Sequence, residues 1–253
     1  MKILFIGTGA ADWVLKERKG DEFFRRLTAV RVNKDLMIDC SADTIDFVER
    51  NEGNLDEVEN VLITHTHSDH YSPETIINIL GDDVRVWAEK EAEEMILSDM
   101  PQLKESVLEI FAENTVGKYT VIPVPASHSV ANRKQTPVNY IISDGEKTIF
   151  WGCDSAWIPN YSWHEMKKHK FDLVVLDGTL GDADGDYRIF EHNNIAMIKE
   201  MTNTIKSQQL LKENGKVMIS HMSRYAHKEH SELQKQLDDV GVIVAYDGME
   251  IEL

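Results

Sequence analysis

Short apolar runs separated by polar turns recur along the whole chain. Many of these runs are rich in valine and isoleucine, which is typical of buried β-strands. The pattern predicts strands over residues 3–6, 29–32, 36–39, 61–63, 84–87, 121–124, 138–143, 147–151, 173–176 and 217–220. Short polar turns join 29–32 to 36–39 and, across Asp144-Gly145, 138–143 to 147–151. Both pairs are therefore expected to form hairpins.

Apolar residues at helical spacing predict helices over residues 42–50, 73–80, 89–99, 192–213 and 230–240. Residues 242–253 are expected to close the chain as a hairpin across Asp247-Gly248, and residues 12–27 to form a loop that overhangs a pocket. Meandering strands come first and strands alternating with helices follow, and this order occurs roughly twice. We therefore expect an α/β fold of two mixed sheets packed face to face with helices outside, in one domain over residues 1–253.

Composition places the chain among ordinary globular proteins. It has 253 residues, of which 42% are hydrophobic and 28% charged. No apolar run approaches the length of a membrane span, and residues 3–6 lead straight into a glycine turn as a first strand would. The two cysteines, Cys40 and Cys153, fit a reducing compartment. We expect a cytoplasmic protein without a membrane partner.

The charge balance restricts the partners of the chain. Its formal net charge is −17, from 44 acidic and 27 basic residues. Binding of long nucleic acids rests largely on Lys and Arg side chains that neutralise phosphates, so this balance opposes it. A small anionic substrate is still compatible with the charge, because metal ions can dominate the field inside a pocket.

The densest chemistry follows the predicted strand at 61–63. Four donor side chains, His65, His67, Asp69 and His70, lie within six residues, and Pro73 then opens a predicted helix. Imidazole and carboxylate groups are common ligands of transition metals. In an extended segment His65 and His67 point to the same side, whereas Asp69 and His70 can face a second position. This spacing suits two neighbouring metals better than one.

Further donors follow other predicted strands. His128, Asp154 and His221 each come directly after an apolar run, and strand ends along one edge of a sandwich lie close together. Each residue alone is weak evidence, but together with the central motif they form a candidate ligand set. Asp39 also ends a predicted strand, where it either forms a turn or supports a metal ligand from behind.

The order His65-x-His67-x-Asp69-His70, then His128, Asp154 and His221, resembles the metallo-β-lactamase superfamily of hydrolases. The resemblance spans the chain and implies a four-layer αββα sandwich with two metals at one edge of the sheets. It implies His65, His67 and His128 as ligands of the first metal. Asp69, His70 and His221 would bind the second, and Asp154 would bridge both.

Within this superfamily the β-lactamases themselves use a cysteine where this chain has Asp154, and Cys153 lies one residue too early. A bridging carboxylate instead resembles the phosphodiesterase and ribonuclease Z branches. Residues 245–250 resemble the ending of the phosphodiesterase that accompanies the carbon–phosphorus lyase pathway. That resemblance implies His192 as a proton donor, and the alternative is a histidine that caps the predicted helix.

The resemblance implies a dinuclear metal-dependent hydrolase that acts on small or cyclic phosphodiesters through a metal-bridging hydroxide. His192 would supply a proton and Asp69 would orient the nucleophile. Zinc or manganese is expected, with iron or nickel as alternatives. The rival functions are a lactone or thioester hydrolase, ribonuclease Z-like processing of transfer RNA, and a metal-dependent binding module without turnover. A homodimer is also an open alternative.

Overall fold

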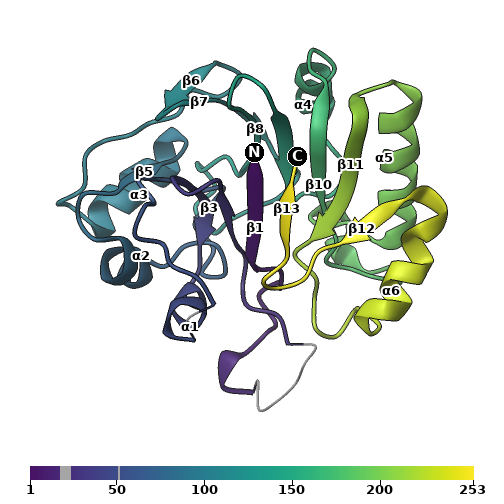
Figure 1. Cartoon of the computed structure of the whole chain (residues 1–253), viewed down its shortest axis with the longest axis horizontal. Coiled ribbons are helices and arrows are strands. Elements are labelled where there is room, and N and C mark those ends of the chain that lie inside the picture. The colour runs from purple at the N-terminus through teal and green to yellow at the C-terminus, as the bar shows by residue number, and fades with distance from the viewer. Residues whose placement is uncertain (18–23, 51) are drawn as a thin grey trace.

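The computed structural model describes residues 1–17, 24–50 and 52–253, and within them two β-sheets are stacked face to face (Figure 1). The first sheet has the order β13-β1-β2-β3-β4-β5. Its strands are β1 Lys2–Gly7, β2 Ala29–Val32, β3 Leu36–Cys40, β4 Asn60–Leu62, β5 Arg85–Trp87 and β13 Glu250–Glu252.

The second sheet has the order β12-β11-β10-β9-β8-β7-β6. Its strands are β6 Asn114–Val116, β7 Tyr119–Pro125, β8 Val138–Ser143, β9 Thr148–Gly152, β10 Phe171–Asp177, β11 Leu211–Ser220 and β12 Val242–Val244. Each sheet is antiparallel in one half and parallel in the other. The parallel strands are β3, β4 and β5 in the first sheet and β9 to β12 in the second.

Helices cover the outer face of each sheet (Figure 1). The first sheet packs against α1 Thr44–Glu49, α2 Pro73–Leu80 and α3 Lys90–Asp99, and the second against α4 Asn160–Met166, α5 Ile195–Ser207 and α6 His230–Leu237. A third apolar core lies between the sheets and includes Phe5, Ile38, Tyr140 and Trp151. This is the four-layer sandwich that the sequence predicts. Among the described residues, no helix is long and apolar enough to cross a membrane.

The predicted helix over 192–213 is wrong at its C-terminal end. Helix α5 ends at Ser207, and Gln209 adopts a left-handed φ of 55°, which breaks the helical path. Leu211 then starts β11 by pairing with Phe171. The helix-forming residues that follow Ser207 were overridden by pairing with a strand distant in sequence.

The predicted closing hairpin over 242–253 is also wrong. Strand β12 pairs in parallel with β11, whereas β13 pairs antiparallel with β1 in the other sheet. The Asp247-Gly248 turn therefore carries the chain from one sheet to the other. The short strand β6 was not predicted, and residues 18–23 of the predicted loop 12–27 lie outside the described residues.

The topology brings the carboxyl ends of several strands to one edge of the sandwich. Strands β9, β10 and β11 run in the same direction, so the residues after each strand emerge side by side. Ligand sites of α/β proteins form at such an edge, because connecting loops there can present side chains without disturbing the core. The predicted metal ligands lie at this edge.

Candidate metal centre

The loop between β4 and α2 carries the central donor motif. Ser72 caps α2 by accepting a hydrogen bond from the Thr75 amide, and Pro73 occupies the first turn. Before the helix, the amides of His70 and Tyr71 both donate to the carbonyl of His67. This tight turn reverses the chain, so His65 and His67 face one position while the residues after the turn face another.

The first donor group joins His65, His67, His128 and Asp154. His67 Nδ1 lies 3.1 Å from His65 Nε2 and 3.2 Å from His128 Nε2. Asp154 Oδ2 lies 3.2 Å from His65 Nε2 and 3.5 Å from His128 Nε2. Three imidazoles and one carboxylate oxygen therefore converge on one point.

The second donor group joins Asp69, His70, Asp154 and His221, all of them buried. His70 Nε2 lies 3.2 Å from His221 Nε2, 3.0 Å from Asp154 Oδ2 and 3.7 Å from Asp69 Oδ2. His221 Nε2 lies 3.3 Å from Asp69 Oδ2. The same oxygen of Asp154 thus belongs to both groups, which is the position of a bridging ligand.

These donor–donor distances fit metal coordination. A tetrahedral ion with zinc–nitrogen bonds of about 2.0–2.1 Å separates its ligands by roughly 3.3 Å, and the distances in both groups scatter around that value. Seven side chains predicted from the sequence are therefore brought together in an arrangement that could hold divalent cations.

Asp39 supports this arrangement from behind. It is fully buried, and its Oδ2 lies 2.7 Å from His70 Nδ1. Its Oδ1 accepts hydrogen bonds from the Thr64 amide and hydroxyl at 2.8 and 3.0 Å. A carboxylate that accepts the proton of Nδ1 fixes the ring so that Nε2 faces the metal position. Asp39 could either form a turn or support a metal ligand, and these contacts favour the second role.

His192 lies beside these two donor groups and also belongs to two further groups that could hold a metal, one with Asp154, Asp177 and His221 and one with His128 and Glu191. Its Nδ1 is 3.1 Å from Asp177 Oδ2 and 3.7 Å from Asp154 Oδ1, and its side chain is 12% exposed. Asp177 and Thr179 were not singled out from the sequence, yet the Thr179 hydroxyl lies 2.8 Å from His221 Nδ1. Asp177 ends β10, level with the ends of β9 and β11. This position at a strand end was the one sequence feature that could have indicated its place in the site.

A comparison with known protein families agrees with this arrangement of donor residues. The family model of the β-lactamase superfamily domain matches residues 34–222, which include the donor motif, His128, Asp154 and His221. The chain belongs to the β-lactamase superfamily. No curated protein matches it by sequence. The superfamily and the two donor groups together indicate a metal-dependent hydrolase.

Several solved structures share the whole fold of this chain. Zinc-bound PqqB from Methylobacterium extorquens superposes with a TM-score of 0.77 at 16% identity, covering 100% of both chains. A diphosphatase from the PhnP family gives 0.73 at 18% identity, covering 100% of this chain and 96% of its own. The short form of human tRNase Z gives 0.69 at 16% identity, with coverages of 100% and 99%. Identities this low establish a common fold only.

The protonation states of the side chains in the two donor groups favour bound cations. Burial lowers the pKa of His65 to about 4 and that of His128 to about 4, so both are neutral near pH 7, as ligation requires. In the second group burial opposes a charge on His70, but Asp154 and Asp39 outweigh it and raise its pKa to about 10. The carboxylates of this group therefore attract positive charge, which a divalent cation can supply.

Three residues of this edge have an uncommon backbone conformation. Asp39, Asp154 and His221 have φ values of 56°, 49° and 64°, in the left-handed region that non-glycine residues rarely occupy. Each lies within two residues of the end of a strand. Strain of this kind persists where surrounding contacts enforce it, and it clusters at functional sites. Cys153, one residue before Asp154, points instead into the core between the sheets.

The other histidines lie outside the donor groups. His164 is exposed on α4, and His169 lies just beyond that helix, half-buried. The Nε2 of His227 lies 3.1 Å from the carbonyl of Thr179. His230 is the first residue of α6, with its ring against Arg25.

Proposed function

We propose that the chain is a dinuclear metal-dependent phosphodiesterase that cleaves small or cyclic phosphodiesters. The observation that carries this proposal is the place of His192, which lies at the donor groups but outside the proposed ligand set. A hydrolase that forms its attacking group on metals needs such a residue only when the leaving group is too basic to depart without a proton. An alkoxide leaving from phosphorus is such a group.

The proposed metal ligands are His65, His67 and His128 in the first group and Asp69, His70 and His221 in the second, with Asp154 shared. Zinc or manganese suits these nitrogen and oxygen donors, with iron or nickel as alternatives. Two divalent cations, when bound, lower the pKa of a shared water and offset the charge of an anionic substrate. Asp69 lines the cleft and would orient the attacking water.

The contacts of His192 support its role as the proton donor. Because Asp177 engages Nδ1, the other ring nitrogen, Nε2, is left for a ligand in the cleft. The buried Asp177 carboxylate holds the ring in one orientation and stabilises its charged form, as an acidic partner does in other catalytic pairs. His192 also lines the same cleft as the donor groups.

The cleft has the size for a small phosphodiester, and bound cations would offset its lining carboxylates, which include Asp69, Asp154 and Glu191. Its volume is about 380 Å³, and Arg188 contributes a guanidinium to its lining. Arg188 is oriented by Asp186, whose Oδ2 lies 2.7 Å from Nη2. The similar structures named for a diphosphatase and for tRNase Z also carry phosphate chemistry in their names. These likenesses support the same substrate class here.

The His192→Ala variant tests the proposal. We expect the purified variant to keep two metal equivalents per chain by elemental analysis. Its turnover of an alkyl diester should fall by about 10²- to 10⁴-fold, because general acid catalysis typically contributes that much. Turnover of an aryl diester should fall far less, since a nitrophenolate departs without a proton. The control is His164→Ala, on the exposed face of α4, which should change neither rate.

An equal loss on both diesters would mean that His192 does not act as the acid, and loss of metal would make it a ligand. Either result would favour the lactone or thioester hydrolase over the phosphodiesterase. Wild-type protein that holds metal yet cleaves no diester would refute the proposed function directly.

A further inference from the structure

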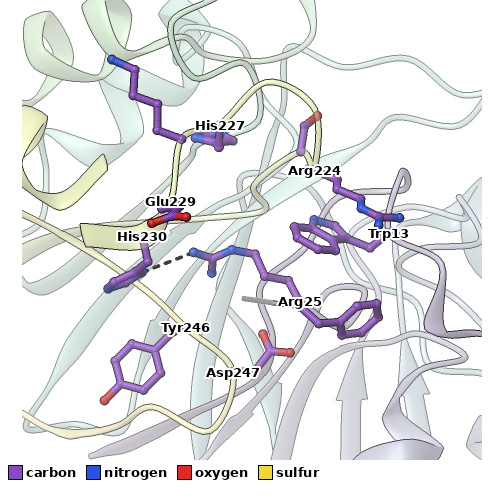
Figure 2. A pocket seen from close by; sticks show the side chains of 11 residues that line it. Trp13, Arg25, Arg224, His227, Glu229, His230, Tyr246 and Asp247 are labelled. Carbon is purple, nitrogen blue, oxygen red and sulfur yellow. Dashed lines mark hydrogen bonds between the residues drawn. The ribbon is translucent and has the colours of Figure 1, made fainter. Parts of the chain in front are cut away.

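A second cavity of about 600 Å³, drawn in Figure 2, shares the lining residue Ser223 with the metal cleft. Its aromatic lining comes from Trp13, Phe24 and Tyr246, and its cationic lining from Arg25, Arg224 and Lys228. Glu229 and Asp247 are its acidic lining residues. Among the described residues, the lining carries three permanent cations and two carboxylates, on a chain whose net charge is −17. Such a lining suits a ligand with an aromatic ring and a negative charge.

The carboxylate of Asp247 is already engaged by the protein. Its Oδ1 accepts hydrogen bonds from the amide and hydroxyl of Thr8 at 3.0 and 2.7 Å, and its Oδ2 accepts one from the Arg26 amide at 2.6 Å. Of the two lining carboxylates, this one is therefore turned toward the protein. The Asp247 carboxylate therefore adds little negative charge to the field that a ligand would meet.

Arg25 forms the charged floor of the cavity. Its Nη1 is held by Thr8 Oγ1 at 2.6 Å and by the carbonyl of Ala245 at 2.7 Å. Its Nη2 meets His230 Nδ1 at a longer 3.4 Å, and Figure 2 shows the guanidinium directed toward that ring. The guanidinium is thus fixed by one nitrogen, while the other has a weaker contact that an anion can replace.

Aromatic surfaces flank this charge. The Arg224 guanidinium lies over the Trp13 ring, 5.6 Å from its centre, and Trp13 Nε1 donates to the carbonyl of Met222 at 2.8 Å. Tyr246, which is 51% exposed, packs edge to face with His230. In Figure 2, Trp13 and Tyr246 stand on opposite sides of Arg25. A planar ring placed between them would stack while its anionic substituent reaches the cations.

The cavity and the metal cleft share a wall. Ser223 lines both, and it follows the proposed ligand His221 by two residues. The Ser223 hydroxyl donates to Asp12 Oδ2 at 2.5 Å, and Asp12 lines the cleft while Trp13 lines the cavity. A ligand that reaches over this Ser223–Asp12 contact would occupy both spaces at once.

We propose that this cavity binds one arm of the substrate, an arm that carries a planar aromatic ring and a second anionic group. This inference rests on the proposed phosphodiesterase function, because the cleaved ester would lie in the adjoining cleft. The chemistry is that of a nucleoside bearing a further phosphate. The substrate class is thereby narrowed from small phosphodiesters to those with such an arm.

Three probes that share one leaving group test the arm. They are methyl p-nitrophenyl phosphate, thymidine 5′-(p-nitrophenyl phosphate), and the same thymidine ester with a 3′-phosphate. We expect the KM of the metal-loaded wild-type protein to fall at each step, since the ring and then the second anion gain contacts. Equal KM values for the three probes would overturn the proposal.

Two variants test which residues of the cavity contact the ring and the second anionic group. Tyr246→Ala should raise the KM of both thymidine esters by about tenfold, which corresponds to about 1.4 kcal/mol, and leave methyl p-nitrophenyl phosphate unchanged. Arg224→Ala should act mainly on the 3′-phosphorylated ester. The matched controls are Tyr161→Ala, an exposed tyrosine on α4, and Arg85→Ala, whose guanidinium lies 5.6 Å from the centre of the Trp87 ring. Equal effects on all probes would overturn the proposal.

A binding experiment separates this inference from the proposed function. Calorimetry on metal-loaded protein should show thymidine 3′,5′-bisphosphate binding more tightly than methyl phosphate, with the difference reduced in Arg224→Ala. If no diester is cleaved but this difference is found, the cavity binds the aromatic anion and the hydrolytic proposal alone fails. If diesters are cleaved and the difference is absent, the arm proposal alone fails.

Discussion

At the scale of single residues, the side chains behind the proposed ligands decide how well they hold a metal. Asp39 is buried and orients His70, while Asp177 orients His192. Partners of this kind fix which ring nitrogen carries the hydrogen, and their loss typically weakens metal affinity by 10- to 100-fold. Asp39 is the clearest case, because its Oδ2 contacts a single imidazole nitrogen at 2.7 Å.

The Asp39→Asn variant should therefore bind metal about 10- to 100-fold more weakly in competition with a chelator. Asparagine tolerates the left-handed backbone of this position, so the change removes charge without straining the chain. Its amide nitrogen cannot accept the His70 proton. Glu93→Gln is the control, since Glu93 is a buried carboxylate that accepts from the Ser106 amide far along the fold. Equal metal affinity in wild type and Asp39→Asn would show that Asp39 only shapes the turn.

The sequence was sufficient to predict seven side chains that the structure brings together, but not all the residues that contact them. His65, His67, Asp69 and His70 stand at a spacing that strand and turn geometry converts directly into two facing positions. Asp177 was missed, because an aspartate before Gly178 at a strand end has the local pattern of an ordinary turn. Its function depends on which strand lies next to β10, and that is fixed by long-range pairing.

At the scale of elements, the loop after β11 links the metal centre to the second cavity. His227 in this loop is nearly buried, and its Nε2 bonds the carbonyl of Thr179. Burial, together with the charge of Arg25, lowers the pKa of His227 to about 4. The folded chain therefore keeps this ring neutral where the unfolded chain, with a pKa near 6.5, would already bind a proton.

Stability should accordingly fall as the pH drops from about 6.5 toward 4, by about 1.4 kcal/mol per pH unit from this group. Between pH 7.5 and pH 5.0 the expected loss is about 2 kcal/mol. His227→Gln keeps a donor for Thr179 but does not titrate. From pH 7.5 to pH 5.0, the unfolding free energy measured in urea should therefore fall by about 2 kcal/mol less in this variant than in the wild type. Parallel pH profiles for the two proteins would contradict this assignment.

The Asp144-Gly145 and Asp247-Gly248 turns look alike in sequence, but their aspartates accept hydrogen bonds from different parts of the chain. Asp144 accepts hydrogen bonds from the amides of Glu146 and Lys147 within its own hairpin. Asp247 instead accepts from Thr8 and Arg26, more than two hundred residues earlier. The closing hairpin was predicted wrongly for this reason. An Asp-Gly pair predicts that the chain turns, but it does not predict which sheet the next strand joins.

Asp247→Ala should lower the unfolding free energy by about 3 kcal/mol, because several buried donors lose their acceptor at about 1–3 kcal/mol each, offset in part by water. For a chain of this size the melting temperature should drop by about 6–12 °C. Asp144→Ala, in the exposed hairpin, should cost no more than about 1 kcal/mol. Similar melting temperatures for both variants would show that the contact between the chain ends adds little.

At the scale of the whole molecule, net charge separates the rival substrates. Processing of transfer RNA needs a basic surface that follows the phosphate backbone, and a net charge of −17 opposes it. The cationic second cavity is small and admits one arm of a ligand. We therefore expect small phosphodiesters to be accepted and long ones excluded.

Transfer RNA in large excess should leave the hydrolysis of thymidine 5′-(p-nitrophenyl phosphate) unchanged at low salt, where any electrostatic binding would be strongest. Thymidine 3′,5′-bisphosphate serves as the positive control and should compete. Inhibition by transfer RNA that fades as salt is added would indicate a nucleic-acid surface and would restore the RNA-processing alternative.

The pairing of β13 with β1 has a consequence for biosynthesis. Among the described residues, strand β1 pairs with β2 on one side and with β13, some 240 residues later, on the other. At about 5–20 residues per second, a ribosome needs on the order of tens of seconds to make the intervening chain. Throughout that time a nascent sheet presents an open edge, and such edges recruit other strands. Protection of the growing chain by a chaperone would matter most in this interval, before translation ends.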